Sequence, residues 1–250
     1  MASASEAKVL GIIPARWGST RFPGKPLHLI AGKALVQHVW DRCQQCENLD
    51  AIVVATDDQR IAAAVKAFGG EVALTSPDHP SGTDRIAEVA QLWPEHSHLI
   101  NIQGDEPLIS PELIDQLAQT LIDQPDCEMV TAANPIHFED PEFSDPNVVK
   151  VVIDHQSRAL YFSRSPIPYQ RSPVADLQTL RHKGIYGFSR EFLLKFVQWQ
   201  PSALERCEQL EQLRALENGT KINVIITSDD SPGIDTPEQA DILDRQFLTE

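Results

Sequence analysis

Short apolar runs alternate with amphipathic stretches along the first half of the chain, and this alternation is the strongest constraint on the fold. The amphipathic stretches repeat apolar residues every three or four positions, which predicts helices, whereas the uniformly apolar runs predict strands that are buried on both faces. Strand–helix–strand units join parallel strands through right-handed crossovers. The sequence therefore predicts an α/β protein with a doubly wound, mostly parallel sheet. The predicted strands lie at residues 9–13, 51–55, 71–75, 98–102 and 128–133, and the helical patterns run through residues 35–40, 61–68, 86–93 and 113–121.

The alternation ends near residue 134, where strand-like runs follow one another without long helices between them. Runs at 147–154, 159–163 and 182–189 predict an antiparallel, β-rich extension over residues 135–200. A chain of 250 residues that is 42% hydrophobic can bury one large core, so we expect a single domain, 1–250, that includes this extension. The expected order ends with helices near 190–199 and 202–217, a strand at 221–227 and a helix from residue 237.

Charge and cysteine content limit the classes of protein to which the chain can belong. A formal net charge of −15 argues against nucleic acid as a partner, because such binding needs many Lys and Arg side chains on one face. Four scattered cysteines are too few for a disulfide scaffold and favour a reducing compartment. No apolar run approaches the roughly 20 residues of a membrane span, and the start MASASEAK lacks a secretory signal pattern. We expect a cytoplasmic protein with no membrane insertion.

The segment GIIPARWGSTRFPGKPL, residues 11–27, places three cations on a loop stiffened by prolines, directly after a predicted strand. It is not a Walker loop, because the glycine spacing differs by one residue and Pro26 replaces the Ser or Thr that would bind magnesium. Arg16, Arg21 and Lys25 repel one another unless an anion lies among them. A solvated surface turn is the alternative, but the pattern favours a phosphate-binding loop.

Parallel sheets bind ligands at the carboxyl ends of their strands, so the loops after residues 13, 56, 75 and 102 are expected to line one crevice. Asp105 follows a predicted strand, and Asp235 precedes a helix that begins at Thr236-Pro237. Carboxylates suit Mg²⁺, which takes one or two of them together with phosphate oxygens. Each aspartate taken alone is better explained as a residue flanking a helix.

Seven segments, in order, resemble the motifs of the CMP-Kdo synthetases, the 3-deoxy-D-manno-octulosonate (Kdo) cytidylyltransferases, within the wider nucleotidyltransferase fold, a Rossmann-like fold. They are spread from residue 9 to about 245, and as a set they are specific. Trp17 and Gly18 in the first segment, and Gln239 in the last, depart from the family pattern. The segments read IIPARWGSTRFPGKPL, DHPSGTDR, NIQGDEP, YFSRSPIPY, RHKGIYGFS, LEQLR and IDTPEQ.

The resemblance implies transfer of CMP from CTP to the anomeric hydroxyl of Kdo, with release of pyrophosphate, for lipopolysaccharide-type glycan synthesis. It implies Asp105 and Asp235 as Mg²⁺ ligands, Arg16 and Lys25 as further catalytic residues, and a homodimer in which the extension contributes sugar and dimer contacts. CTP contacts are implied for Pro14, Ala15, Arg16, Arg21, Lys25, Ser81, Gly82, Thr83 and Arg85. Sugar contacts are implied for Gln103, Arg164, His182, Tyr186, Glu211 and Gln212.

Simpler explanations exist for several of these residues. Ser81, Gly82 and Thr83 are also suited to begin a helix. His182 is equally a surface histidine at the end of a strand, and Glu211 and Gln212 fit an exposed helix face. At the level of function, the alternatives are a cytidylyltransferase for another acidic sugar such as sialic acid, and a nucleotide-binding regulator without catalytic activity.

Overall fold

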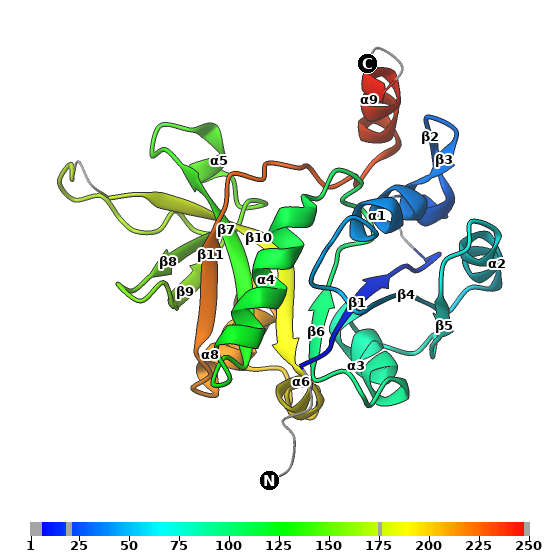
Figure 1. Ribbon diagram of the computed structural model, residues 1–250. Helices are drawn as coiled ribbons and strands as arrows, with labels where there is room; N and C mark the ends of the chain where they lie inside the picture. The colour runs from blue at the N-terminus through cyan, green and yellow to red at the C-terminus, as the bar shows by residue number, and fades with distance from the viewer. Residues whose placement is uncertain (1–6, 19–21, 175–176, 248–250) are drawn as a thin grey trace, which may run out of the picture. The chain divides into compact units, whose positions relative to one another are not determined.

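The computed structural model describes residues 7–18, 22–174 and 177–247 (Figure 1). They form two compact units, the first with residues up to 118 and from 231 onward, and the second with residues 119–230. Helix α4 (Pro111–Asp123) carries the chain from the first unit into the second. The extension predicted over 135–200 lies within the second unit.

The first unit is built on a parallel sheet in the order β6-β1-β4-β5. Its strands are β1 (Val9–Pro14), β4 (Ala51–Thr56), β5 (Val72–Leu74) and β6 (His98–Asn101). In register, Gly11 of β1 lies beside Ile52 of β4 on one side and Ile100 of β6 on the other. Val9, Leu10, Ile12 and Ile13 are all fully buried, as expected for a strand covered on both faces.

Helices follow each strand of this sheet, and Figure 1 shows α1 and α3 on opposite sides of it. The helix starts match their sequence signals: Ser81 caps α3, and Leu113 N donates to Ser110 Oγ at the start of α4. The helices and short elements of this unit are η1 (Lys25–Leu27), β2 (Leu29–Ile30), β3 (Lys33–Ala34), α1 (Leu35–Cys43), α2 (Gln59–Ala67), α3 (Gly82–Leu92) and α9 (Pro237–Phe247).

The second unit is mostly antiparallel, in the strand order β11-β7-β10-β8-β9. Its strands are β7 (Met129–Ile136), β8 (Lys150–Ile153), β9 (Ala159–Ser163), β10 (Thr179–Ser189) and β11 (Ile222–Ile226). The β11–β7 pair is parallel, and the pairs β7–β10, β10–β8 and β8–β9 are antiparallel. An antiparallel bridge between Arg158 and Asn223 connects the turn before β9 back to β11. The helices are α5 (Pro141–Ser144), α6 (Arg190–Phe196), α7 (Ala203–Glu208) and α8 (Gln212–Glu217).

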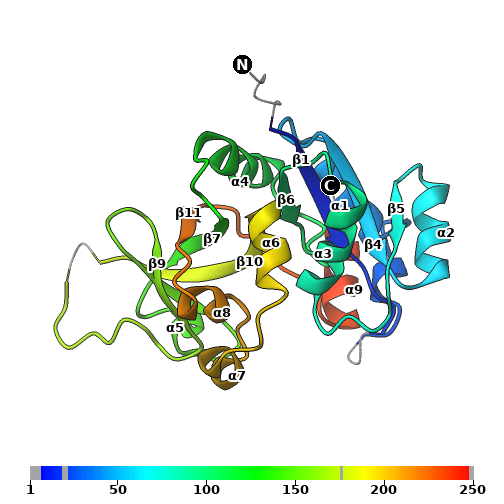
Figure 2. The ribbon, with the colours of Figure 1, turned by 90° about the horizontal axis from the view of Figure 1, so that it is seen from below.

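The predicted fold, a mostly parallel sheet with added antiparallel strands, is confirmed, with two differences among the helices of the second unit. The short helix α5 was not predicted. The single helix expected over 202–217 is divided into α7 and α8, which lie side by side (Figure 2). Gln209, after α7, has φ 54° and ψ 48°, a left-handed conformation that a right-handed helix cannot include. The chain therefore turns at Gln209 before α8 begins.

No helix in the described part of the chain combines the length and apolar character needed to cross a membrane.

Candidate functional site

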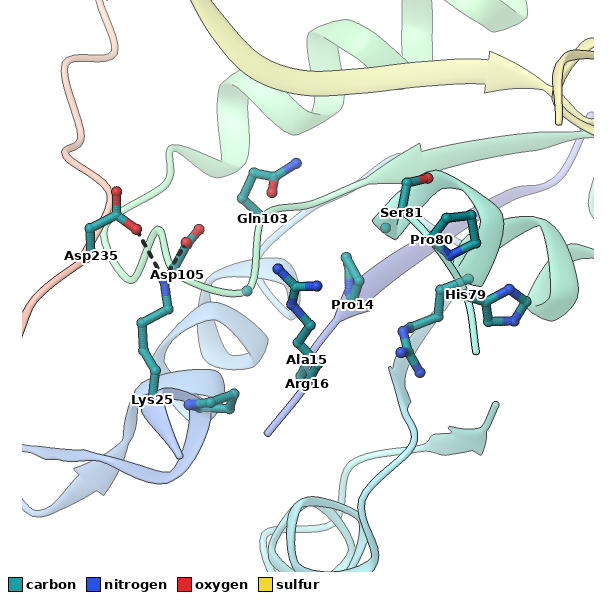
Figure 3. Close-up of a pocket in the computed structure, with 14 residues that line it drawn as sticks. Pro14, Ala15, Arg16, Lys25, His79, Pro80, Ser81, Gln103, Asp105 and Asp235 are labelled. Carbon is teal, nitrogen blue, oxygen red and sulfur yellow. Dashed lines mark hydrogen bonds and ion pairs between the residues drawn. The ribbon is translucent and has the colours of Figure 1, made fainter. Parts of the chain in front are cut away.

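A cavity of about 330 Å³ opens at the carboxyl ends of β1 and β6 in the first unit. Loops after three of the predicted strands line it, those following residues 13, 75 and 102, which confirms most of the expected crevice. The loop after residue 56 differs, since Asp57 is not among the lining residues and instead accepts a hydrogen bond from Arg85. The lining residues are Pro14, Ala15, Arg16, Lys25, Pro26, His79, Pro80, Ser81, Gly82, Arg85, Gln103, Gly104, Asp105 and Asp235 (Figure 3).

Trp17 and Gly24 form the neck of the cationic loop, where main-chain and ring contacts join its two ends. Gly24 N donates to Trp17 O at 3.1 Å, and the Trp17 ring lies so close to Gly24 that a Cβ there would be 2.8 Å from it. Gly24 also has φ 72°, so glycine is required for both space and conformation. The neck fixes the adjacent Arg16 and Lys25, which both line the cavity. Arg21 lies outside the described residues.

Lys25 brings the two predicted metal ligands together. Its Nζ donates to Asp105 Oδ2 at 2.6 Å, to the carbonyl of Ile234 at 2.8 Å and to Asp235 Oδ1 at 3.4 Å. The main chain supports this arrangement, because Ile234 N donates to Asp105 O at 2.8 Å. Gln239 Oε1 accepts from Asp235 N at 2.6 Å, so the departure at Gln239 supplies an anchor for Asp235.

The turn before α3 forms the opposite end of the cavity in the view of Figure 3. Ser81 Oγ accepts from Asp84 N at 3.1 Å and donates to Asp84 Oδ2 at 2.7 Å, so the predicted helix cap is present. Thr83 is buried in α3 and is not a lining residue. Arg85 is also buried and donates to Thr75 Oγ1 and to Asp57. Its guanidinium therefore reaches the cavity with part of its donors already used.

Four lining residues were not expected from the sequence: Pro26, His79, Pro80 and Gly104. His79 Nε2 contacts the Glu88 carboxylate of α3, and this hydrogen bond holds the pKa of Glu88 below its usual value although burial opposes the shift. All of these residues lie inside segments that resemble the family motifs, so the complete segments were the sequence signal that could have identified them.

The β10 strand of the second unit holds His182 and Tyr186 on either side of a bulge, where the pairing with β7 shifts between Lys183 and Tyr186. Thr131 of β7 fills the bulge: its hydroxyl lies 2.7 Å from Ile185 O and 2.9 Å from His182 Nε2. A hydroxyl has one proton, which the carbonyl takes, so Thr131 accepts from a protonated His182 Nε2. Burial lowers the pKa of His182 to about 3 and raises that of Tyr186, to which Glu211 also contributes. Neutral His182 therefore keeps Nδ1 as an acceptor.

The pKa of His182 predicts a pH dependence of stability. Because the folded pKa, about 3, lies below the value of 6.5 for an unfolded chain, the unfolded state binds the extra proton between these values. The free energy of unfolding is therefore expected to fall on acidification below about pH 6.5, with a contribution from His182 of up to about 1.4 kcal/mol per pH unit. Urea unfolding of the wild type and of His182→Gln at several pH values measures this contribution as a difference in slope. Equal slopes in the two proteins would contradict it.

Arg164, in the loop after β9, is already bonded to the main chain of the second unit. Its guanidinium donates to the carbonyls of Glu208 at 2.7 Å, Pro146 at 3.0 Å and Gln209 at 3.4 Å. The fully buried Lys150 donates to Arg164 O at 2.7 Å, which fixes the main chain at the same point. Of the five guanidinium N–H groups, two remain without a partner within the described chain.

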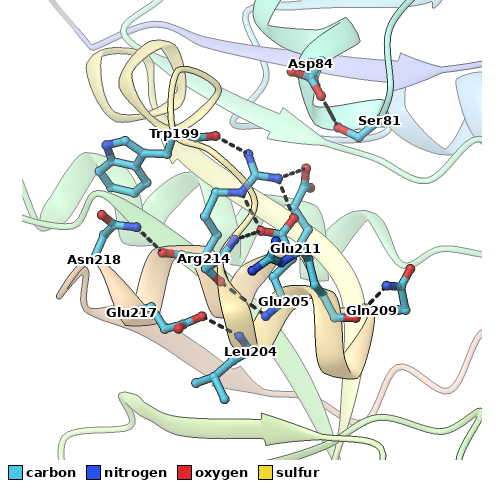
Figure 4. Close-up of polar contacts among 12 residues, drawn as sticks. Ser81, Asp84, Trp199, Leu204, Glu205, Gln209, Glu211, Arg214, Glu217 and Asn218 are labelled. Atoms are coloured by element: carbon cyan, nitrogen blue, oxygen red, sulfur yellow. Dashed lines mark hydrogen bonds and ion pairs between the residues drawn. The ribbon is translucent and has the colours of Figure 1, made fainter.

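Glu211 and Gln212 stand at the start of α8, which Arg214 anchors (Figure 4). Arg214 donates to Glu205 of α7 through Nε at 2.8 Å and Nη2 at 2.6 Å, and to Trp199 O at 3.3 Å. Gln212 is 3% exposed, and its Nε2 has no hydrogen-bond partner in the part of the chain that the structure describes. A buried amide donor without an acceptor is costly, so Gln212 Nε2 is available to donate to a ligand or a water molecule.

Comparison with known proteins agrees with this geometry. A family model described as cytidylyltransferase matches residues 10–222. The curated 3-deoxy-manno-octulosonate cytidylyltransferase of Solibacter usitatus is 50% identical over 242 residues, covering 96% of this chain and 94% of its own. The protein of that name from Syntrophobacter fumaroxidans is 49% identical over 239 residues, with 94% and 95% covered. The chain belongs to the 3-deoxy-manno-octulosonate cytidylyltransferase family.

Solved structures place this family member among known folds. A structure of CMP:2-keto-3-deoxy-manno-octonic acid synthetase complexed with CTP matches with a TM-score of 0.92 at 41% identity, covering 97% of this chain and 99% of that chain. A cytidylyltransferase from Leptospira borgpetersenii matches with a TM-score of 0.66 at 20% identity, covering 98% and 88%. The second match shows the common fold alone.

The donor set around Lys25 fits a hard divalent cation in this family member. The carboxylates of Asp105 and Asp235 converge on one ammonium, which shows that they can share a single cation. Among the described residues no group of three or more His, Cys, Asp or Glu side chains is arranged to hold a metal, so a cation here needs further oxygens from phosphate or water. Two carboxylates with phosphate oxygens are a common Mg²⁺ environment.

Proposed function

We propose that this protein transfers CMP from CTP to Kdo and releases pyrophosphate, and that the product serves lipopolysaccharide-type glycan synthesis. The 2-hydroxyl oxygen of Kdo forms a bond to the α-phosphorus of CTP as the bond between that phosphorus and the bridging oxygen of pyrophosphate breaks, and the hydroxyl proton passes to solvent. The observation that carries this proposal is the cavity in which Arg16 and Lys25 lie with Asp105 and Asp235, within one compact unit.

Each end of the cavity suits a different part of CTP. Arg16 is exposed, and its forked guanidinium can bind the β- and γ-phosphates and stabilise the charge that develops on pyrophosphate. The turn of Ser81 and Gly82, with Pro14 and Ala15 at the end of β1, offers backbone and hydroxyl groups for the cytosine edge. Thr83 and Arg85, in the first turn of α3, complete the proposed set of CTP-binding residues. We place Arg21 with the phosphate-binding residues.

Asp105 and Asp235 would hold Mg²⁺. When bound, the ion supplies charge stabilisation at the phosphate oxygens and lowers the pKa of the attacking hydroxyl. The aspartates orient the reactants by fixing the position of the triphosphate, and Lys25 offers a point charge beside them.

Kdo carries a carboxylate and several hydroxyls. We assign its contacts to the two remaining N–H groups of Arg164, the acceptor Nδ1 of His182 and the unpartnered amide of Gln212, as supported by the bonds described above. The phenol of Tyr186, the carboxylate of Glu211 and the amide of Gln103 complete the proposed set.

A direct assay tests the activity and its alternatives together. The full-length protein is incubated with Mg²⁺, each of the four nucleoside triphosphates and a panel of acidic sugars, and products are identified by mass. We expect CMP-Kdo from CTP and Kdo. Formation of a CMP conjugate with sialic acid instead would select the alternative sugar, and nucleotide binding without any product would select the regulator.

The neck of the cationic loop gives a prediction with an internal control. Gly24→Ala adds a methyl group against the Trp17 ring, whereas Gly32→Ala adds one at a similar φ of 78° with nothing within 4 Å. Both carry the cost of left-handed backbone, but only the first displaces the loop. We expect kcat/KM for CTP to fall roughly 10- to 100-fold in Gly24→Ala and to change little in Gly32→Ala, measured by pyrophosphate release. Equal losses would show that the ring contact has no role.

We also propose that the protein is a cytoplasmic homodimer that does not bind nucleic acid. The second unit supports the dimer, because it exposes the large apolar side chains of Leu160, Tyr169, Val174 and Leu177. Size-exclusion chromatography with light scattering measures the mass in solution. A monomer at micromolar concentration would exclude the dimer.

A further inference from the structure

We propose that Lys25 is a stand-in for the divalent cation: its ammonium holds Asp105 and Asp235 together before nucleotide binds, and it must leave them when CTP and metal arrive. The inference rests on the proposed function, since it takes CTP and Mg²⁺ as the ligands of this site. It assigns Lys25 a positioning role that precedes the reaction.

The donor count at Lys25 is the first observation. An ammonium has three N–H donors. All three have acceptors within the cluster, Asp105 Oδ2 at 2.6 Å, Ile234 O at 2.8 Å and Asp235 Oδ1 at 3.4 Å. The side chain of Lys25 is 14% exposed. Lys25 therefore has no donor left for a phosphate while it keeps these three partners, and binding the triphosphate requires that at least one of them be released.

The second observation is that the ammonium and a metal ion would use the same oxygens. Mg²⁺ binds carboxylate oxygens at about 2.0–2.1 Å. An ammonium 2.6 Å from Asp105 Oδ2 lies within a few ångströms of any such ion, and two positive charges at that separation repel strongly. The carboxylates themselves stay accessible, with 31% and 46% of the side chains of Asp105 and Asp235 exposed. The metal can therefore reach them once the ammonium moves.

The Lys25 side chain can move more readily than the segments that carry the two aspartates. Lys25 begins η1 and carries its charge on a flexible four-carbon stem, which can turn toward phosphate without a change in the main chain. Asp235, in contrast, is held by the hydrogen bond from Ile234 N to Asp105 O and by Gln239. These bonds fix the main chain at both aspartates while the cation between their side chains is exchanged.

Exchange of the Lys25 ammonium for a metal ion couples the binding of metal to the binding of nucleotide. Nucleotide favours metal binding in two ways, because its phosphates attract Lys25 and also supply oxygens to the ion. Metal binding must favour nucleotide binding by the same factor. Without nucleotide, Lys25 competes with the metal and keeps the affinity of the pair low.

The test measures metal binding in the absence of nucleotide and sugar, with Mn²⁺ as the probe and electron paramagnetic resonance as the readout. Lys25→Met removes the competing charge, and we expect it to bind Mn²⁺ at least about tenfold more tightly than the wild type. Mn²⁺ should also raise its melting temperature more than that of the wild type. Lys33→Met is the matched control, since Lys33 lies 2.6 Å from Asp41 in an exposed ion pair, and it should bind Mn²⁺ as the wild type does.

Two further variants make the result decisive. Lys25→Met/Asp105→Asn should lose the added affinity, which would assign it to this pair of carboxylates. Lys25→Gln keeps amide donors without charge and should behave as Lys25→Met does. If both Lys25 variants fold only when Mn²⁺ is present, the metal has replaced the ammonium and the proposal holds. Wild-type or weaker Mn²⁺ affinity in folded Lys25 variants, or unfolding that Mn²⁺ does not reverse, would overturn it. Because CTP and Kdo are absent, failure of the product assay would affect only the proposed function.

Discussion

Asp105→Asn is expected to lower kcat for CMP-Kdo formation by roughly 10³-fold while the protein stays folded. The substitution keeps the shape of the side chain and removes the negative charge of Asp105. This charge binds the Lys25 ammonium and would bind a divalent ion in its place. Because the lost interaction acts in the transition state, kcat and kcat/KM should fall together, as pyrophosphate release with CTP, Kdo and Mg²⁺ would show. Asp235→Asn should follow the same pattern.

The matched control for these variants is Asp41→Asn, which breaks the exposed ion pair with Lys33 and should keep the wild-type rate. Circular dichroism of each variant confirms that the fold is intact. Near-wild-type turnover of folded Asp105→Asn or Asp235→Asn would remove that residue from the metal site. A higher KM for CTP at unchanged kcat would instead assign the aspartate to uniform binding of nucleotide.

Arg214→Met is expected to have the largest effect on stability, a loss of about 3–5 kcal/mol in the free energy of unfolding. The side chains of Arg214 and Glu205 are 8% and 12% exposed and share two hydrogen bonds. Removal of the guanidinium leaves a carboxylate that is buried without its partner, and it also removes the contact of Arg214 over the Phe196 ring. Urea unfolding followed by circular dichroism measures the loss.

Two control variants distinguish the effect of an unpaired buried charge on stability from the general effect of replacing a charged side chain. Lys33→Met, at an exposed pair, should cost less than about 1 kcal/mol. The double variant Arg214→Met/Glu205→Gln should recover much of the stability, because residue 205 is then uncharged while its amide oxygen can still accept from Ser202 N, as Glu205 does at 3.0 Å. A double variant as unstable as Arg214→Met alone would mean that packing, and not the unpaired carboxylate, causes the loss.

Local sequence patterns were sufficient for most of the fold because strands and helix starts carry short-range signals. The apolar run at 9–13 predicted β1, and Thr236-Pro237 predicted the start of α9, where Gln239 N donates to Thr236 Oγ1 at 3.4 Å. The break at Gln209 has no such signal. A glutamine in left-handed conformation is held there by contacts made elsewhere, including the hydrogen bond from Arg164 to its carbonyl.

The candidate site shows the same limit. The family motifs selected most of the residues that line the cavity, and the position of Asp105 after a strand placed it there by topology. The sequence did not indicate that Lys25 would lie between the aspartates, nor that the main chain would use three donors of Arg164. Such partners depend on side-chain geometry between residues far apart in the chain, which no local pattern encodes.

The contact between Gly24 N and Trp17 O has a consequence for changes in loop length. Phe22 lies between the two joined ends of this loop, is 7% exposed and packs in one buried cluster with Ile234 and Leu243. A longer loop between Trp17 and Phe22 would shift this buried ring relative to the segment that carries Asp235. Insertions there should therefore lower both stability and turnover, and a tag or reporter group belongs elsewhere on the protein.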